Sequence, residues 1–157
     1  MRLTDVLKKE LIKIPLEGTT RNACIQELIT CLSANNLIKN NDAIFNAVLD
    51  RENIMTTGVG NGIAIPHCKH EASPEFAVCL GIHTKGVDFD SIDKKPVKII
   101  FLLVGPENNP SLHIKLLSRI SRLMSNEDLR HQLLLARKTD EALQLVEDEE
   151  NYFFEID

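Results

Sequence analysis

The sequence lacks the features that mark nucleic-acid binding, export and insertion into a membrane. Its 157 residues carry a net charge of −5 and no long basic run that could follow a phosphate backbone, so nucleic acid is not an expected partner. The first residues hold no apolar signal core, and the longest buried-looking apolar run, residues 99–104, is far too short to span a bilayer. We therefore expect a cytoplasmic protein with no direct membrane insertion.

The cysteine spacing argues against a disulfide scaffold. The four cysteines form no CxxC pair and no framework spacing, in a chain large enough to fold without disulfides: Cys24, Cys31, Cys68 and Cys79. We expect reduced thiols that are mostly small core residues.

The composition is typical of one globular domain. Hydrophobic residues make up 43% of the chain and charged residues 26%, and a domain of this length buries roughly two-thirds of its unfolded surface. No repeat, low-complexity tract or Gly/Ser linker divides the sequence. We expect a single domain over residues 1–157.

Four segments predict strands. Ile12, Ile14 and Leu16 alternate with polar or constrained positions, which predicts an edge strand because Pro15 cannot donate to a central ladder. Residues 63–65 predict a short strand. Residues 76–83 and 97–104 are near-continuous apolar runs typical of strands covered on both faces, with a turn or short hairpin between them.

Helices are predicted on both sides of these strands. The first is capped by Thr19 or Thr20, and the second runs from Asn41 or Asp42 to near Arg51. The apolar stripe of the first runs toward Leu37 and Ile38 and comprises Cys24, Ile25, Leu28, Ile29 and Leu32.

The last third predicts helices alone. Ser111 can cap one helix, and Ser125 and Thr139 each precede an acidic first turn. Helices before and after a cluster of strands indicate an α/β domain, with a mixed β-sheet covered by helices.

Residues 57–67, TGVGNGIAIPH, form the most informative segment. Its three glycines permit backbone geometries closed to other residues, and Pro66 fixes its own φ directly before His67. The glycines do not form a dinucleotide fingerprint, because Ile63 occupies the third glycine position and the segment follows a helix. A neutral imidazole can attack phosphorus at physiological pH, so His67 is a candidate nucleophile, with a buried structural histidine as the alternative.

Two other chemistries are open at the same position. His67, Cys68 and His70 could bind a metal, although no second matched pair accompanies them. A Cys68 nucleophile with a histidine base is possible in principle, but no cysteine-hydrolase signature surrounds it.

Three further residues are candidates for a phosphoryl site, each with a simpler alternative. His113, in the first turn of its predicted helix, could donate a hydrogen bond to a phosphoryl oxygen, or it could be an amphipathic boundary residue. Arg51 could pair with phosphoryl oxygens or complement its helix dipole. Thr57 could add a hydroxyl donor or serve as a turn residue.

These residues together carry a family resemblance. Arg51-Glu52, the segment 57–67 and His113-Ile114-Lys115-Leu116-Leu117 strongly resemble the fructose/mannitol-type (type 2) enzyme IIA domain of the bacterial phosphoenolpyruvate-dependent sugar phosphotransferase system, including its nitrogen-regulatory relative. The resemblance covers nearly the whole chain. Cys68 is one departure, because the motif often has glycine there; it should alter packing or oxidation sensitivity beside the site.

The resemblance implies a fold of the mannitol-specific enzyme IIA type, with helices on both faces of the sheet. It further implies that His67 accepts a phosphoryl group from HPr or a paralogue and passes it to a cysteine of enzyme IIB, flanked by Arg51 and His113, with Thr57 a lesser candidate. No cofactor or metal is expected. The alternative is a nitrogen-type regulatory module, whose phosphorylation state controls binding to target proteins. The sequence does not name the sugar.

Overall fold

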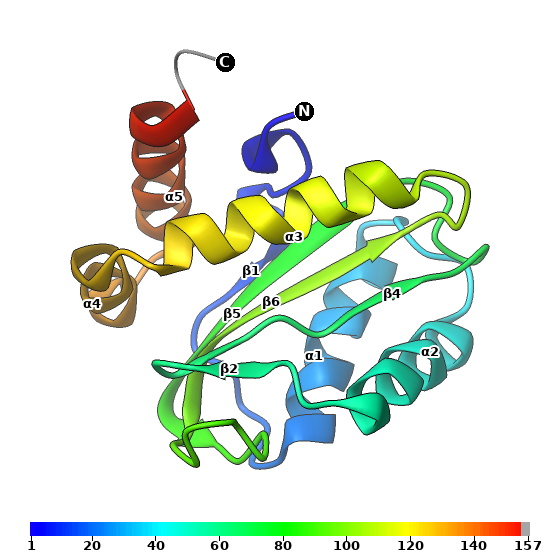
Figure 1. Cartoon of the computed structure of the whole chain (residues 1–157), viewed down its shortest axis with the longest axis horizontal. Helices are drawn as coiled ribbons and strands as arrows, with labels where there is room; N and C mark the ends of the chain where they lie inside the picture. Colours follow the sequence, from blue (N-terminus) through cyan, green and yellow to red (C-terminus); the bar gives the residue numbers. More distant parts are fainter. Residues whose placement is uncertain (155–157) are drawn as a thin grey trace.

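A mixed sheet forms the centre of the protein (Figure 1). The computed structural model describes residues 1–154, and in this range the sheet has six strands in the order β1-β5-β6-β3-β2, with β4 also paired to β6. The strands are β1 (Ile12–Lys13), β2 (Gly58–Gly60), β3 (Ile63–Ala64), β4 (His67–Lys69), β5 (Ala77–Val87) and β6 (Val97–Gly105). The predicted mixed sheet is confirmed.

The two long strands carry the core of the sheet. β5 and β6 pair antiparallel, and both are almost fully buried because helices lie on either side of them. β3 and β4 both run parallel to β6, in register at Ile63 with Ile99 and at His67 with Leu103. The segment 63–69 is therefore one extended path along β6 that is interrupted between its two strands.

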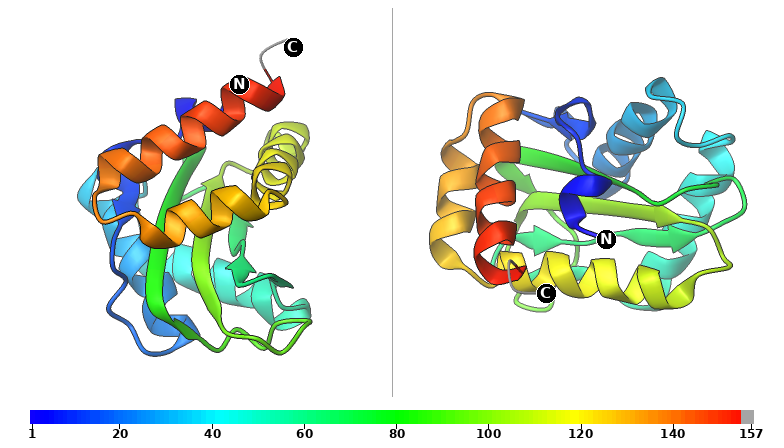
Figure 2. Two further views of the ribbon diagram at one scale, coloured as in Figure 1. Left: turned by 90° about the vertical axis from the view of Figure 1, so that its left-hand side faces the viewer. Right: turned by 90° about the horizontal axis from the view of Figure 1, so that it is seen from above.

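Helices cover both faces, as predicted (Figures 1 and 2). On one face lie α1 (Arg21–Ala34), which contacts β5, and α2 (Asn41–Ile54), which contacts β4. On the other lie α3 (Pro110–Met124) and α4 (Glu127–Leu135), which contact β6, and α5 (Thr139–Phe154), which packs on α3 and α4. None of the helices within residues 1–154 has the length and apolar character needed to cross a membrane.

The starts of the first two helices agree with the sequence, and their ends differ. Thr20 caps α1 by accepting from the Ala23 amide, and α2 begins at Asn41. α1 ends at Ala34, so Leu37 and Ile38 are not helical; Asn36 takes a positive φ of 59° just beyond the helix. α2 continues one turn past the predicted end, to Ile54.

The predicted cap of α3 was wrong, whereas the acidic first turns predicted after Ser125 and at Thr139 are confirmed. Asn109 caps α3 through its side chain, and Pro110 occupies the first helical position, where its missing N–H costs nothing. Ser111 therefore lies inside the helix. Asn126 instead of Ser125 caps α4, and Thr139 is itself the first residue of α5.

The strand boundaries also needed correction. β1 is an edge strand as predicted, but it spans only Ile12–Lys13, and Leu16 reaches the sheet through one bond from its amide to the Ile82 carbonyl. β5 extends four residues beyond the predicted end at residue 83. The short strand at 63–65 stops at Ala64.

The glycine segment is a β2–β3 hairpin. β2 pairs antiparallel with β3, and Gly60, Asn61 and Gly62 all have positive φ at the turn. Gly58 is required for a different reason: a Cβ at this position would collide with the side chain of Ser91. The hairpin holds the start of the segment 63–69 against β6.

Candidate functional site

A cavity of about 420 Å³ lies where α2, β4 and α3 meet. It is lined by three of the four predicted site residues, His67, Arg51 and His113. The other lining residues are Ala47, Asp50, Ile54, Cys68, Lys69, Ile114 and Leu117. Residues far apart in the sequence thus form one site at the end of β6.

The backbone around Pro66 positions His67. Pro66 has no N–H, so it cannot donate to β6, but its carbonyl accepts from the Leu103 amide at 3.0 Å. Pairing resumes at once, with His67 opposite Leu103. His67 is therefore the first residue of β4, in contrast to the prediction that it follows the last strand of this segment.

The His67 ring has a defined tautomer. Its Nδ1 lies 2.8 Å from the carbonyl oxygen of Ile65. A carbonyl can only accept, so Nδ1 carries the proton and the lone pair of the neutral ring is on Nε2. Burial lowers the pKa of His67 below its usual value; the Ile65 hydrogen bond opposes this effect and the nearby Arg51 charge adds to it. The half-buried ring is neutral at pH 7 and has a nucleophilic nitrogen.

His113 is a second neutral imidazole beside the first. The two ring centroids are 5.5 Å apart, and Phe76 lies 6.1 Å away on the other side of His113. His113 is only 3% exposed, and neither of its ring nitrogens has a hydrogen-bond partner among the described residues. Burial lowers its pKa to about 4, and repulsion from Lys69 and from the protonated form of His67 acts in the same direction. Such an unpaired buried group is rare and requires an explanation.

Arg51 lies in the last turn of α2, where it can both complement the end of its helix and border the cavity, the two roles that the sequence left open. Its Nη1 donates to the Met55 carbonyl at 2.8 Å, so it caps its own helix, and its side chain also lines the cavity. One of five N–H donors is used in the cap bond. The guanidinium is therefore held in place while it borders the cavity.

Thr57 is placed differently from the other three. It is 4% exposed, its hydroxyl donates to Glu52 Oε1 and its amide to Glu52 Oε2, both at 2.6 Å, and it is not among the described residues that line the cavity. Its role as a phosphate ligand stays a prediction. The same contacts give a role to Glu52, which was named above only as part of the family motif: it anchors α2 to the glycine hairpin.

Lys69 lines the cavity but was not among the predicted site residues. It is exposed, and it lies two residues after His67 on the same strand. The two-residue period of a strand places such a pair on one side of the sheet, so the spacing could have indicated it. Lys69 adds a second positive charge to that of Arg51, opposed by Asp50.

The alternative chemistries of this segment have little support. Cys68 is buried, and burial raises its pKa to about 12, which disfavours the thiolate that nucleophilic attack requires. The His70 Nδ1 accepts from the Ala72 amide. Within residues 1–154, no three His, Cys, Asp or Glu side chains lie close enough together to hold a metal ion.

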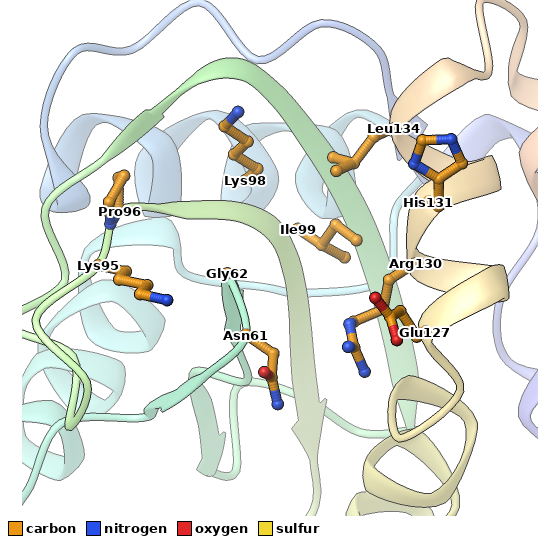
Figure 3. Close-up of a pocket in the computed structure, with 10 residues that line it drawn as sticks. All are labelled: Asn61, Gly62, Lys95, Pro96, Lys98, Ile99, Glu127, Arg130, His131 and Leu134. Atoms are coloured by element: carbon orange, nitrogen blue, oxygen red, sulfur yellow. The ribbon is translucent and has the colours of Figure 1, made fainter.

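A second cavity, of about 360 Å³, lies at the opposite end of β6 and contains none of the predicted site residues (Figure 3). Side chains of α4 and of the segment before β6 surround it, including Lys95, Arg130 and His131. The side chain of His131 is exposed, so His131 is a useful reference for the buried histidines of the first site.

The fold and the site define a class of protein. The fold matches that of the mannitol enzyme IIA in its complex with phosphorylated enzyme IIB from Escherichia coli, with a TM-score of 0.77 over 91% of this chain and 99% of that chain, at 21% identity. The nitrogen regulatory protein IIA-Ntr of Neisseria meningitidis superposes with a TM-score of 0.85, at 26% identity over 90% of this chain and 97% of that chain. The structure therefore has the fold of the enzyme IIA proteins.

The sequence comparison gives the family. Residues 5–149 match the family described as phosphoenolpyruvate-dependent sugar phosphotransferase system, EIIA 2, and the chain belongs to this family. Components of this kind carry phosphoryl groups, which makes the protein a phosphotransferase component.

Relatives of both expected kinds are similar to the chain. The fructose-specific EIIA component of Haloferax volcanii is 34% identical over 93% of the chain and 92% of its own length. The nitrogen regulatory protein of Bradyrhizobium diazoefficiens is 35% identical over 87% and 89%. The fructose-specific EIIABC component of Bacillus subtilis is 34% identical over 93% of the chain, which spans only 23% of that protein.

The depressed pKa of His113 predicts a pH-dependent stability. The folded protein keeps the ring neutral down to about pH 4, whereas the unfolded chain takes up a proton near pH 6.5, so protonation favours unfolding as the pH falls between these values. His113→Leu removes this proton uptake. We expect the free energy of unfolding of the variant to exceed that of the wild type increasingly from pH 6.5 to 4, measured by urea denaturation. A constant difference across this range would contradict the assignment, and His131→Leu is the exposed control.

Proposed function

We propose that the protein is a phosphoryl carrier of fructose/mannitol-type sugar uptake, in which His67 accepts a phosphoryl group from HPr or an HPr-like phosphocarrier protein and passes it to a cysteine of enzyme IIB. The observation that carries the proposal is the His67 tautomer: Nδ1–H donates to the Ile65 carbonyl, which leaves the lone pair on Nε2 of a ring that lines the cavity. Family membership supports the same chemistry.

The proposed reaction has two transfers at one nitrogen. In the first, Nε2 forms a bond to phosphorus as the N–P bond of the donor histidine breaks, and the donor ring keeps the electron pair. In the second, the sulfur of a thiolate on enzyme IIB forms an S–P bond as the N–P bond on His67 breaks. The Nδ1 bond to Ile65 fixes the ring in both steps, and such fixed orientation is a major source of rate enhancement.

The surrounding charges are suited to the transferred group. A phosphoryl group in transit carries negative charge on three oxygens, and stabilisation comes mainly from positioned cations and donors. Arg51 and Lys69 supply positive charge at the cavity wall. His113, buried and neutral, has an N–H without a partner among the described residues, and this proton can be donated to a phosphoryl oxygen.

The rim of the cavity is suited to protein partners. Ile54 is 81% exposed and Ile114 is 67% exposed, and both border the cavity, where Leu117 adds further apolar surface. Large exposed apolar side chains gathered in one place mark interaction surfaces. A carrier must present its histidine to two different proteins, and an open site with an apolar rim permits this.

His67→Ala is predicted to abolish labelling of the protein by phosphoenolpyruvate, enzyme I and HPr, because the accepting nitrogen is lost. The matched control is His131→Ala, which removes an exposed histidine of the second cavity and should be labelled at the wild-type rate. Radiolabel or intact mass measures both variants. Unchanged labelling of His67→Ala would refute the proposal.

Arg51→Ala and His113→Leu are predicted to slow phosphoryl transfer by on the order of 10²-fold each, because each removes a donor or charge beside the transferred group. His113→Leu should fold at least as stably as the wild type, since an apolar side chain of similar size replaces a buried group without partners. Quenched-flow rates with saturating phospho-HPr test both variants, with circular dichroism as the folding control. Wild-type rates in both would remove these residues from the site.

A second candidate function is a regulatory module that uses phosphorylation of His67 to change its affinity for target proteins. The similarity to nitrogen regulatory proteins, at 35% identity for one relative and a TM-score of 0.85 for another, favours it. The added charge at His67 would alter the docking surface formed by the rim.

One experiment separates the two functions. The phosphorylated chain is mixed with enzyme IIB proteins of fructose and mannitol type, and the label on the IIB cysteine is measured. If the protein is a transport component, the label moves from His67 to the cysteine of at least one enzyme IIB, and the Cys→Ser variant of that enzyme IIB accepts no label. Stable phosphorylation on His67 with every IIB tested supports the regulatory role.

A further inference from the structure

We propose that Cys31 and Cys79 form an oxidant-responsive thiol pair, which closes into an intramolecular disulfide between α1 and β5 when a peroxide oxidises the sulfur of Cys31. The pair lies away from the cavity around His67, and the inference does not depend on the proposed transfer reaction.

Helix packing brings the two thiols together. Cys31 lies on α1 and Cys79 in the middle of β5, the strand on which α1 packs. The Cys79 sulfur is 3.5 Å from the carbonyl oxygen of Leu28, one helical turn before Cys31, so it reaches the backbone of α1 beside Cys31. The side-chain interaction between the two thiols is also the largest influence on the pKa of each. A disulfide requires the two Cα atoms to lie within about 7 Å of each other, so its formation tests this packing directly.

Cys31 and Cys79 differ in exposure and in pKa, the two properties that distinguish a cysteine that reacts with peroxide from the cysteine that then forms the disulfide with it. Cys31 is half-buried and reachable from solvent, whereas Cys79 is 0% exposed. The hydrogen bond from Cys79 lowers the pKa of Cys31 to about 7, against the opposing effect of burial, while the same contact and burial raise the pKa of Cys79. Thiolate character and access both favour Cys31 as the first sulfur oxidised.

The other two cysteines have the environment of inert core thiols. Cys24 is 0% exposed and Cys68 is 5% exposed. Burial raises the pKa of Cys24 to about 11 and that of Cys68 to about 12. We therefore expect selective reaction at Cys31.

The chemistry balances with hydrogen peroxide as the oxidant. The Cys31 sulfur attacks one peroxide oxygen, the O–O bond breaks, and Cys31 sulfenic acid and one water form, the thiol proton going to the departing oxygen. The Cys79 sulfur then attacks the Cys31 sulfur. The S–S bond forms, the S–O bond breaks, and the departing hydroxide takes the Cys79 proton as a second water. Two thiols are oxidised and one peroxide is reduced.

The disulfide would also change local contacts. The Cys31 sulfur donates to the Glu10 carbonyl at 3.1 Å, and the Asn35 side-chain amide reaches the same carbonyl at 3.5 Å. A sulfur in a disulfide cannot donate, so the link between α1 and the 3₁₀ turn at Lys9–Leu11, just before β1, weakens on oxidation.

The test uses the full reduced chain. It is treated with stoichiometric hydrogen peroxide, its free thiols are blocked with N-ethylmaleimide after unfolding, and it is digested without reductant for mass spectrometry. We expect Cys31 linked to Cys79, an intact mass lower by about 2 Da before blocking, and reversal by dithiothreitol. Wild-type protein in which Cys31 proceeds to sulfinic acid while Cys79 stays a free thiol would overturn the proposal, as would a linkage between other cysteines.

Three variants make the assignment specific. Cys24 and Cys31 fall in one tryptic peptide, residues 22–39, so Cys24→Ala must retain the linkage to Cys79. Cys31→Ser must lose the linkage and leave Cys79 reduced. Cys79→Ala must leave Cys31 as a sulfenic acid that dimedone traps. If Cys79→Ala does not fold, the comparison of wild type with Cys24→Ala and Cys31→Ser still decides the question.

Discussion

The parallel pairing of residues 63–69 along β6 is the constraint on which the site depends. β3 and β4 both pair with β6, and Ile65 and Pro66 lie between them. Pro66 has no N–H to donate, but its carbonyl accepts a hydrogen bond from β6 and so continues the pairing. This leaves the Ile65 carbonyl to accept from the His67 ring. One backbone irregularity thus sets both the position of the imidazole and the nitrogen that carries its proton. The Glu52–Thr57 bonds fix the other end of the segment, where α2 leads into the glycine hairpin.

The site contains two neutral imidazoles that are partly or fully buried, and burying them lowers the stability of the folded protein. Burial opposes charge on both rings, and the proximity of the rings opposes it further for His113. Neither ring nitrogen of His113 is satisfied within the described chain, whereas His67 is held by Ile65. Unsatisfied buried donors cost stability, and proteins retain them where an incoming group will use them. An anion beside His67 would give the His113 N–H the acceptor that the protein does not provide.

Local chemistry explains what the sequence could predict. The sequence predicted the Thr20 cap of α1 and the apolar strands β5 and β6, because each of these features depends on residues that are close together in the chain. The Ser111 cap failed because Asn109-Pro110 gives a stronger start signal two residues earlier. Residue type made Arg51, His67 and His113 candidates for one phosphoryl site, and the family resemblance implied that they meet there. The role of Glu52 could not be predicted, because its partner Thr57 comes within reach only once the chain has turned from α2 into β2. Lys69 was missed because the sequence did not show that β4 begins at His67.

The sheet itself separates the thiol pair from the phosphoryl site. Cys79 pairs with Leu102 on β6 and His67 with Leu103, and successive residues of a strand point to opposite faces. The Cys79 sulfur accordingly reaches α1, while the His67 ring lies against His113 of α3. Oxidation would therefore act first on the packing of α1 against β5, away from the hydrogen bond between His67 and Ile65. Since neither modification uses an atom of the other site, both can be present on one molecule. An influence of one on the other can pass through β6 or through the contact of α1 with α2, the helix that carries Arg51.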